Sequence, residues 1–80
     1  MPRYFFHEAD GHVAPDKTGT ELLDTAAART EAIRFAGAVL ADQPDLLDGN
    51  QHFRVEVADT GGRLLFTVVV LTITPAMPGS

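Results

Sequence analysis

Eighty residues make one domain, with no room for a second core. Apolar residues make up 45% and charged residues 21% of the chain, which is ordinary for a soluble globular protein and argues against wholesale disorder. The net charge of −5 argues against nucleic acid as a direct ligand, because phosphate binding needs clustered Lys and Arg. Cysteine is absent, which excludes disulfides and thiolate metal sites.

Neither an export signal nor a membrane span is predicted. The first residues show no basic segment followed by an apolar signal region. The longest apolar run, residues 64–73, is about half of the roughly 20 residues that a membrane helix needs. We therefore expect a cytoplasmic protein without a membrane partner.

The first predicted element is a hairpin. Tyr4, Phe5 and Phe6 place bulky side chains on both faces of a strand over residues 3–8. Asp10-Gly11 is a common turn dipeptide. A second strand, ending near residue 22 and broken or bulged around Pro15, completes the hairpin.

A helix over residues 26–41 is predicted next. The segment is rich in alanine and lacks a β-branched cluster. Asp24 is a suitable N-cap, and Pro44 prevents the helix from running much further. Spacing of 100° per residue places the following residues on one apolar stripe: Ala28, Ala32, Phe35, Ala36 and Val39.

The last predicted element is a second hairpin. Residues 53–57 alternate apolar and charged side chains, which indicates a half-buried strand. Residues 59–62 tolerate positive φ and predict a tight turn. Residues 64–73 are apolar on both faces, and prolines after them predict a tail over residues 75–80.

These elements predict an α+β fold for residues 1–74: a four-stranded antiparallel sheet in β-β-α-β-β order, with one helix packed on one face. The first and fourth strands are apolar on both faces and belong in the middle of the sheet. The third strand exposes charges and the second contains Pro15, so both suit edges. The expected strand order is 2-1-4-3.

Several motifs carry a family resemblance. They are Pro2-Arg3-Tyr4-Phe5-Phe6-His7, Asp10-Gly11, Asp16-x-x-Gly19-Thr20-Glu21-Leu22, Asp24-x-x-Ala27-Ala28-Arg29-x-Glu31-Ala32 and Val55-Glu56-Val57-x-Asp59-x-x-Gly62-Arg63-x-Leu65-x-Thr67-Val68. With these motifs the chain resembles a family of short bacterial proteins known only as a domain of unknown function. The resemblance covers most of residues 2–70 and implies a small α+β domain. It supplies no assigned activity, cofactor or catalytic residue. Residues 69–73 extend beyond the point where members of that family are expected to stop.

The predicted fold leaves an apolar surface without a cover, because one helix cannot hide both faces of the sheet. An exposed apolar row usually marks a partner surface. We expect a homodimer formed by sheet-to-sheet packing or by exchanged C-terminal strands; the alternative is a tail that folds back over this face. The expected contact residues are Phe66, Val68, Val69, Val70 and Leu71, with Tyr4 and Phe6, or Phe5, as neighbours.

A metal or small-ligand site is the second functional hypothesis. His7, Asp10 and His12 could converge across the first hairpin, but a further ligand would have to come from Asp16 or His52. No cofactor is predicted.

Catalysis is not predicted, because cysteine is absent, the only serine is Ser80 and the threonines have no recognisable base partner. The aromatic residues beside Arg3 could stack on nucleic-acid bases, but the acidic balance favours their placement in a core or dimer contact. The sequence thus favours a non-catalytic module that acts by self-association or protein–protein interaction.

Overall fold

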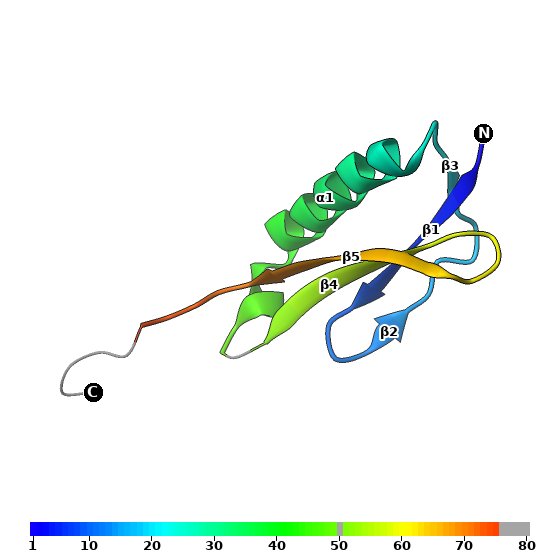
Figure 1. Ribbon diagram of the computed structural model, residues 1–80. Coiled ribbons are helices and arrows are strands. Elements are labelled where there is room, and N and C mark those ends of the chain that lie inside the picture. Colours follow the sequence, from blue (N-terminus) through cyan, green and yellow to red (C-terminus); the bar gives the residue numbers. More distant parts are fainter. Residues whose placement is uncertain (50, 76–80) are drawn as a thin grey trace.

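The predicted α+β fold is confirmed by a computed structural model, which describes residues 1–49 and 51–75. One α-helix lies on one side of an antiparallel sheet (Figure 1). The elements in chain order are β1 (Arg3–Ala9), β2 (Val13–Ala14), β3 (Thr20–Glu21), α1 (Thr25–Asp42), the 3-10 helix η1 (Pro44–Leu47), β4 (His52–Ala58) and β5 (Leu64–Leu71).

The strand order differs from the one that the sequence predicts. The sheet runs β2-β1-β4-β5, so β4 is central and β5 lies at an edge. Residue Val57 of β4 lies opposite Phe6 of β1 on one side and opposite Phe66 of β5 on the other. The predicted order 2-1-4-3 is therefore wrong. The charges of β4 need only a face without a helix above it, and they do not require an edge position.

The opposite edge of the sheet is broken, as Pro15 predicts. β2 and β3 have two residues each and pair with different parts of β1, which raises the strand count from four to five within the described residues. Between them the Phe6 backbone N–H donates to Asp16 Oδ2 at 3.2 Å. A carboxylate thus takes the place of a neighbouring strand at this point.

Small residues bring α1 close to the sheet. Ala28, Ala32 and Ala36 are at most 2% exposed and belong to one core cluster with Phe53, Val55 and Val57 of β4. The helix begins as predicted, because Asp24 Oδ1 accepts a hydrogen bond from the Ala27 backbone N–H at 2.8 Å. No helix among the described residues combines the length and the apolar character that crossing a membrane requires.

The chain leaves the body of the fold after β5. The strand ends at Leu71, two residues earlier than predicted, and the following segment runs away from the sheet (Figure 1). Ile73 is 84% exposed, so the described part of this segment, which ends at Pro75, does not fold back over the apolar face. Most of the predicted tail, residues 76–80, lies outside the described residues.

Candidate functional site

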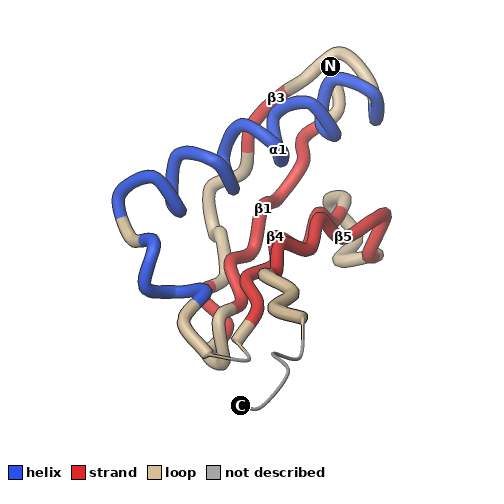
Figure 2. The backbone as a smooth tube through the Cα atoms, turned by 90° about the vertical axis from the view of Figure 1, so that its left-hand side faces the viewer, coloured by secondary structure: helices blue, strands red, loops and turns tan. Residues whose placement is uncertain are grey.

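The edge of β5 that faces away from β4 is the candidate site, and we call it the β5 edge. β5 pairs with β4 on one side and with no other described strand, and Figure 2 shows it at the outer margin of the sheet. Residues 64–75 include no charged side chain. Natural edge strands are usually short, charged, interrupted by proline or bulged, because their free N–H and C=O groups can pair with another chain. The pairing of β4 with β5 shows one irregularity, a register shift between Val57 and Ala58 of β4, opposite the start of β5.

The side chains of β5 divide between two faces of the sheet. Phe66, Val68 and Val70 are half-buried against the core beneath α1. Val69 and Leu71 are 50% and 51% exposed on the opposite face, which we call the outer face. The five predicted contact residues of β5 therefore lie on one strand, but only Val69 and Leu71 among them are exposed.

A groove on the helix side runs along the β5 edge. It has a volume of about 510 Å³ and lies between α1 and β5. Its lining residues are Thr25, Arg29, Ile33, Leu65, Phe66, Thr67 and Val68. Ile33 is 55% exposed, whereas the other large apolar residues of α1, Phe35, Val39 and Leu40, pack against the core cluster. The apolar surface at this edge thus includes α1 as well as β5.

The centre of the outer face is polar rather than apolar. Arg54 Nε lies 3.0 Å from Glu56 Oε2, and both side chains are about one-third exposed. His7 of β1 lies directly opposite Glu56 in the β1–β4 pairing. Apart from Val13 at the other edge, the exposed large apolar side chains of the sheet therefore lie on β5, and not across the centre of the outer face.

Tyr4 and Phe6 do not belong to the exposed surface, which corrects their predicted role as neighbours in the contact. They are 5% and 8% exposed and lie in the core cluster beneath α1. Phe5, the other candidate, alternates with them on β1 and is half-buried. Period-2 alternation decides which ring a helix covers, and the run of three aromatics did not reveal its phase.

The three candidate metal ligands do not meet at one point, and the side chains of His7 and Asp10 hold local structure instead. His7 Nδ1 accepts a hydrogen bond from the Asp16 backbone N–H at 3.0 Å. Asp10 Oδ1 accepts one from the His12 backbone N–H at 3.3 Å. Within residues 1–49 and 51–75 no three His, Asp or Glu side chains are grouped so that they could hold a metal ion.

Asp16, which the sequence suggests only as a possible extra metal ligand, has a structural role. Its carboxylate accepts hydrogen bonds from the backbone N–H groups of Phe6, Thr18 and Gly19 at 3.2, 2.9 and 3.0 Å. Partial burial raises the pKa of Asp16, but these three donors and nearby His7 outweigh it, so the pKa lies below its ordinary value. The spacing Asp16-x-Thr18-Gly19 is a signal of such a turn, because an aspartate can accept from backbone groups two and three residues later.

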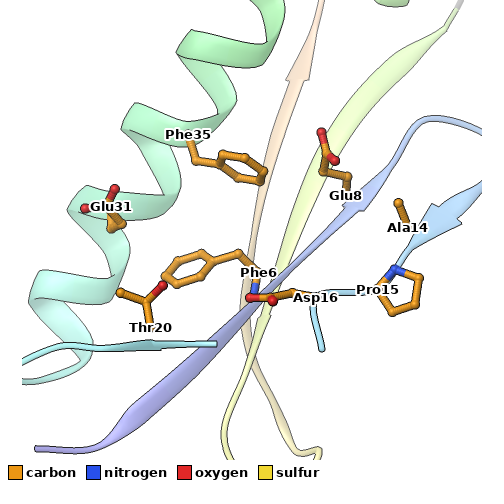
Figure 3. A pocket seen from close by; sticks show the side chains of 8 residues that line it. All are labelled: Phe6, Glu8, Ala14, Pro15, Asp16, Thr20, Glu31 and Phe35. Atoms are coloured by element: carbon orange, nitrogen blue, oxygen red, sulfur yellow. The ribbon is translucent and has the colours of Figure 1, made fainter. Parts of the chain in front are cut away.

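A hollow of about 380 Å³ lies between α1 and the broken edge of the sheet. Figure 3 shows the rings of Phe6 and Phe35 between the helix and β1, with Asp16 beside Phe6. The lining residues are Phe6, Glu8, Ala14, Pro15, Asp16, Thr20, Glu31 and Phe35. Because the Asp16 carboxylate is already bound to backbone N–H groups, it shapes this wall of the hollow rather than offering a free ligand.

Comparison with known proteins gives a family without an assigned activity. No match was found among curated proteins or among solved structures. A family model described as a domain of unknown function (DUF6894) matches residues 3–72, which confirms the predicted resemblance. The match includes all of β5, so residues 69–72 are part of the family domain and not an extension beyond it. The chain therefore belongs to this family of domains of unknown function.

Proposed function

We propose that this protein is a non-catalytic module that acts by self-association through the β5 edge. The observation that carries the proposal is an edge strand of eight residues with no charged side chain, no proline and no described strand on the side away from β4. Such an edge is a ready template for another strand. A cytoplasmic location is part of the proposal, since a chain without cysteine needs no oxidising compartment.

The small core of this domain gives a second reason for association. The largest fully buried side chains are Phe53, Val55 and Val57, and the helix contributes only alanines to the fully buried set. Domains of this size commonly gain stability from a partner subunit, a metal or disulfides. Disulfides are excluded by composition, and no metal-binding group is found in the described part of the chain.

The alternative, a metal or ligand site built on His7, Asp10 and His12, has less support. The imidazole of His7 already accepts the Asp16 backbone N–H, and Asp10 accepts the N–H of His12. These contacts stabilise the turn between β1 and β2 and the segment that follows β2. No group of three possible ligands is found among the described residues.

Val69→Asp tests the proposal. Val69 is half exposed, so the chain should still fold. In paired β5 strands an aspartate here would weaken the contact, because aspartate has a low strand propensity and the two introduced carboxylates would repel each other across the joined strands. We expect light scattering of the wild type at micromolar concentration to give twice the 8.6 kDa chain mass, and the variant to give the chain mass. In a homodimer the substitution occurs twice, so a cost of about 1 kcal/mol at each site would raise the dissociation constant by about 30-fold.

Val13→Asp is the matched control. It makes the same substitution at a 58% exposed valine of β2, at the other edge of the sheet, and should leave the dimer mass unchanged. A wild-type protein that stays at the chain mass, or a folded Val69→Asp variant that keeps the dimer mass, would contradict the proposal.

A further inference from the structure

We infer that two copies join edge to edge, with their β5 strands antiparallel, so that both α1 helices lie on the same side of one joint sheet and Ile33 faces its own counterpart. The inference rests on the proposed self-association and specifies the contact surface. It adds the Ile33 side of α1 to the interface and excludes packing of one outer face on another.

The outer face is a poor contact surface because its centre carries charge. Burying the Arg54–Glu56 pair beneath a second sheet would remove two charges from water, and this desolvation can exceed their mutual attraction. Pairing through the β5 edge leaves the Arg54–Glu56 pair accessible to water. It also satisfies backbone N–H and C=O groups that otherwise depend on solvent.

Antiparallel pairing of β5 with itself places compatible side chains opposite one another. A two-fold axis perpendicular to the sheet keeps each side chain on its own face and therefore keeps both helices on one side. With the axis at Val68, for example, Phe66 would lie opposite Val70 of the second copy, and Thr67 opposite Val69. Neighbouring registers also pair apolar or threonine side chains, because residues 64–73 hold no others.

The position of α1 leaves the right space for a second helix. α1 contacts both β4 and β5, so its axis runs above these two strands. With strands about 4.8 Å apart, the two helix axes would lie roughly 10–14 Å from each other, slightly beyond the 8–10 Å of direct helix packing. Ile33 lines the groove beside Phe66 and Val68, near the middle of β5, and its side chain would fill this gap together with the copy's Ile33.

The distribution of charge also favours the antiparallel arrangement. The residue that follows β5 lies near η1, since Thr72 Oγ1 is 3.5 Å from the Leu47 carbonyl oxygen. η1 contains Asp45 and is followed by Asp48. The start of β5 lies near Arg29 of the groove and follows Arg63. Antiparallel pairing separates the two acidic ends by about 27 Å, the length of an eight-residue strand, which is well beyond the Debye length of about 8 Å.

Single-cysteine crosslinking tests this geometry, because the natural chain contains no cysteine. In full-length protein, Ile33→Cys should form a covalent dimer with a short bismaleimide, whereas Glu56→Cys, at the centre of the outer face, should not. Arg34→Cys is the control for random collision, since Arg34 is an exposed neighbour on the same helix. The Ile33→Cys reaction should be at least about tenfold faster than this control, because side chains held together react at a high effective concentration.

The possible results separate the inference from the proposed function. If the wild type is a dimer but Glu56→Cys crosslinks and Ile33→Cys does not, the outer faces pack together; the inference is overturned and self-association stands. A dimer in which neither cysteine reacts faster than the control also overturns the inference. A wild type that is monomeric by light scattering overturns both.

Ile33→Asp gives an independent measurement. The residue is 55% exposed, so the chain should still fold. The dimer dissociation constant should rise by at least about tenfold, because the new carboxylates of the two copies would repel each other near the two-fold axis. Arg34→Asp is the matched control and should leave the constant unchanged within about threefold. Equal constants for Ile33→Asp and the wild type would place α1 outside the interface.

Discussion

At the scale of single residues, Asp16 replaces part of a strand. On the side away from β4, β1 pairs with β3 at its start and with β2 at its end. Between β2 and β3 the chain does not pair with the sheet. The carboxylate of Asp16 accepts the Phe6 N–H that a partner strand would otherwise accept, and it also holds Thr18 and Gly19 in place. Charge-assisted hydrogen bonds of this kind are stronger than neutral ones, so this side chain fixes the route of the segment.

Asp16→Asn should destabilise the fold by about 1–2 kcal/mol at pH 7. An amide keeps the shape of the side chain but turns one acceptor into a donor that faces a backbone N–H. Urea denaturation of both proteins measures the difference. Asp10→Asn, which affects one 3.3 Å bond in an exposed turn, should cost less than about 0.5 kcal/mol and serves as the control.

The same carboxylate predicts a pH dependence with a definite sign. Because the folded pKa of Asp16 lies below its ordinary value, its contribution is fully present above the unfolded pKa of about 4 and is lost as the pH falls towards the folded pKa. The stability gap between wild type and Asp16→Asn should therefore narrow when denaturation is repeated at about pH 3. A gap that widens in acid would show that the carboxylate is not stabilised by its charge.

At the scale of elements, α1 packs closely against the sheet on one side and has a glycine, Gly37, on its exposed side. Ala28, Ala32 and Ala36 allow α1 to lie close to β4, and larger side chains there would push it away. Gly37, in contrast, is exposed, and a Cβ added there would meet nothing within 4 Å. Glycine inside a helix is unfavourable because it loses more backbone freedom on folding than alanine does.

Gly37→Ala should therefore stabilise the protein by about 0.5–1 kcal/mol, which chemical denaturation can measure. Gly19→Ala provides the contrast, because Gly19 has φ +76° and a new Cβ would lie 2.8 Å from Arg3 Cγ and 2.9 Å from Phe5 Cε2. That variant should be destabilised by at least about 1 kcal/mol. If Gly37→Ala proved no more stable than the wild type, the glycine would have a contact that the subunit alone does not reveal.

The alternation of side chains predicted the elements well but not the order of the strands. Phe53, Val55 and Val57 alternate with charges in sequence, and they are the buried face of β4 as expected. The same alternation predicts an edge strand, although a central strand with one uncovered face has the same pattern. β5 is apolar on both faces, a pattern that predicts burial within the sheet. An edge strand that a second chain covers would be apolar in the same way, so period alone cannot separate the two.

The site could be predicted only in part for a related reason. The exposure of Val69 and Leu71 follows from an unusually apolar strand, and the sequence contains that signal. The groove beside Ile33 does not appear in the sequence, because it depends on which flank of α1 lies over β5. Helical periodicity places Ile33 at the border of the apolar stripe, and only the packing of α1 shows which side remains open.

At the scale of the whole molecule, the chain is elongated and has a small core for its length. The radius of gyration is 14.6 Å, compared with about 12 Å for a compact domain of this size. The segment that projects after β5 contributes to this shape (Figure 1). Under the proposed function, a large part of the stability should come from the second copy.

The melting temperature should therefore depend on protein concentration. For two chains that unfold together, a tenfold increase in concentration should raise the midpoint by about 4 °C. Val69→Asp should melt at a temperature that is independent of concentration, because its subunits are already separate. Calorimetry over a hundredfold range of concentration makes the comparison, and a wild-type midpoint that does not move would contradict the dimer.

The two margins of the sheet differ in a way that limits growth. One edge of the sheet is the eight-residue β5. At the other edge, β2 and β3 have two residues each, and between them the Asp16 carboxylate already accepts the Phe6 N–H of β1. A chain that can accept a neighbour on one flank alone has no means of continuing a filament. Assembly through β5 should therefore end at a closed dimer, so that a protein could keep an exposed apolar edge strand without forming fibres.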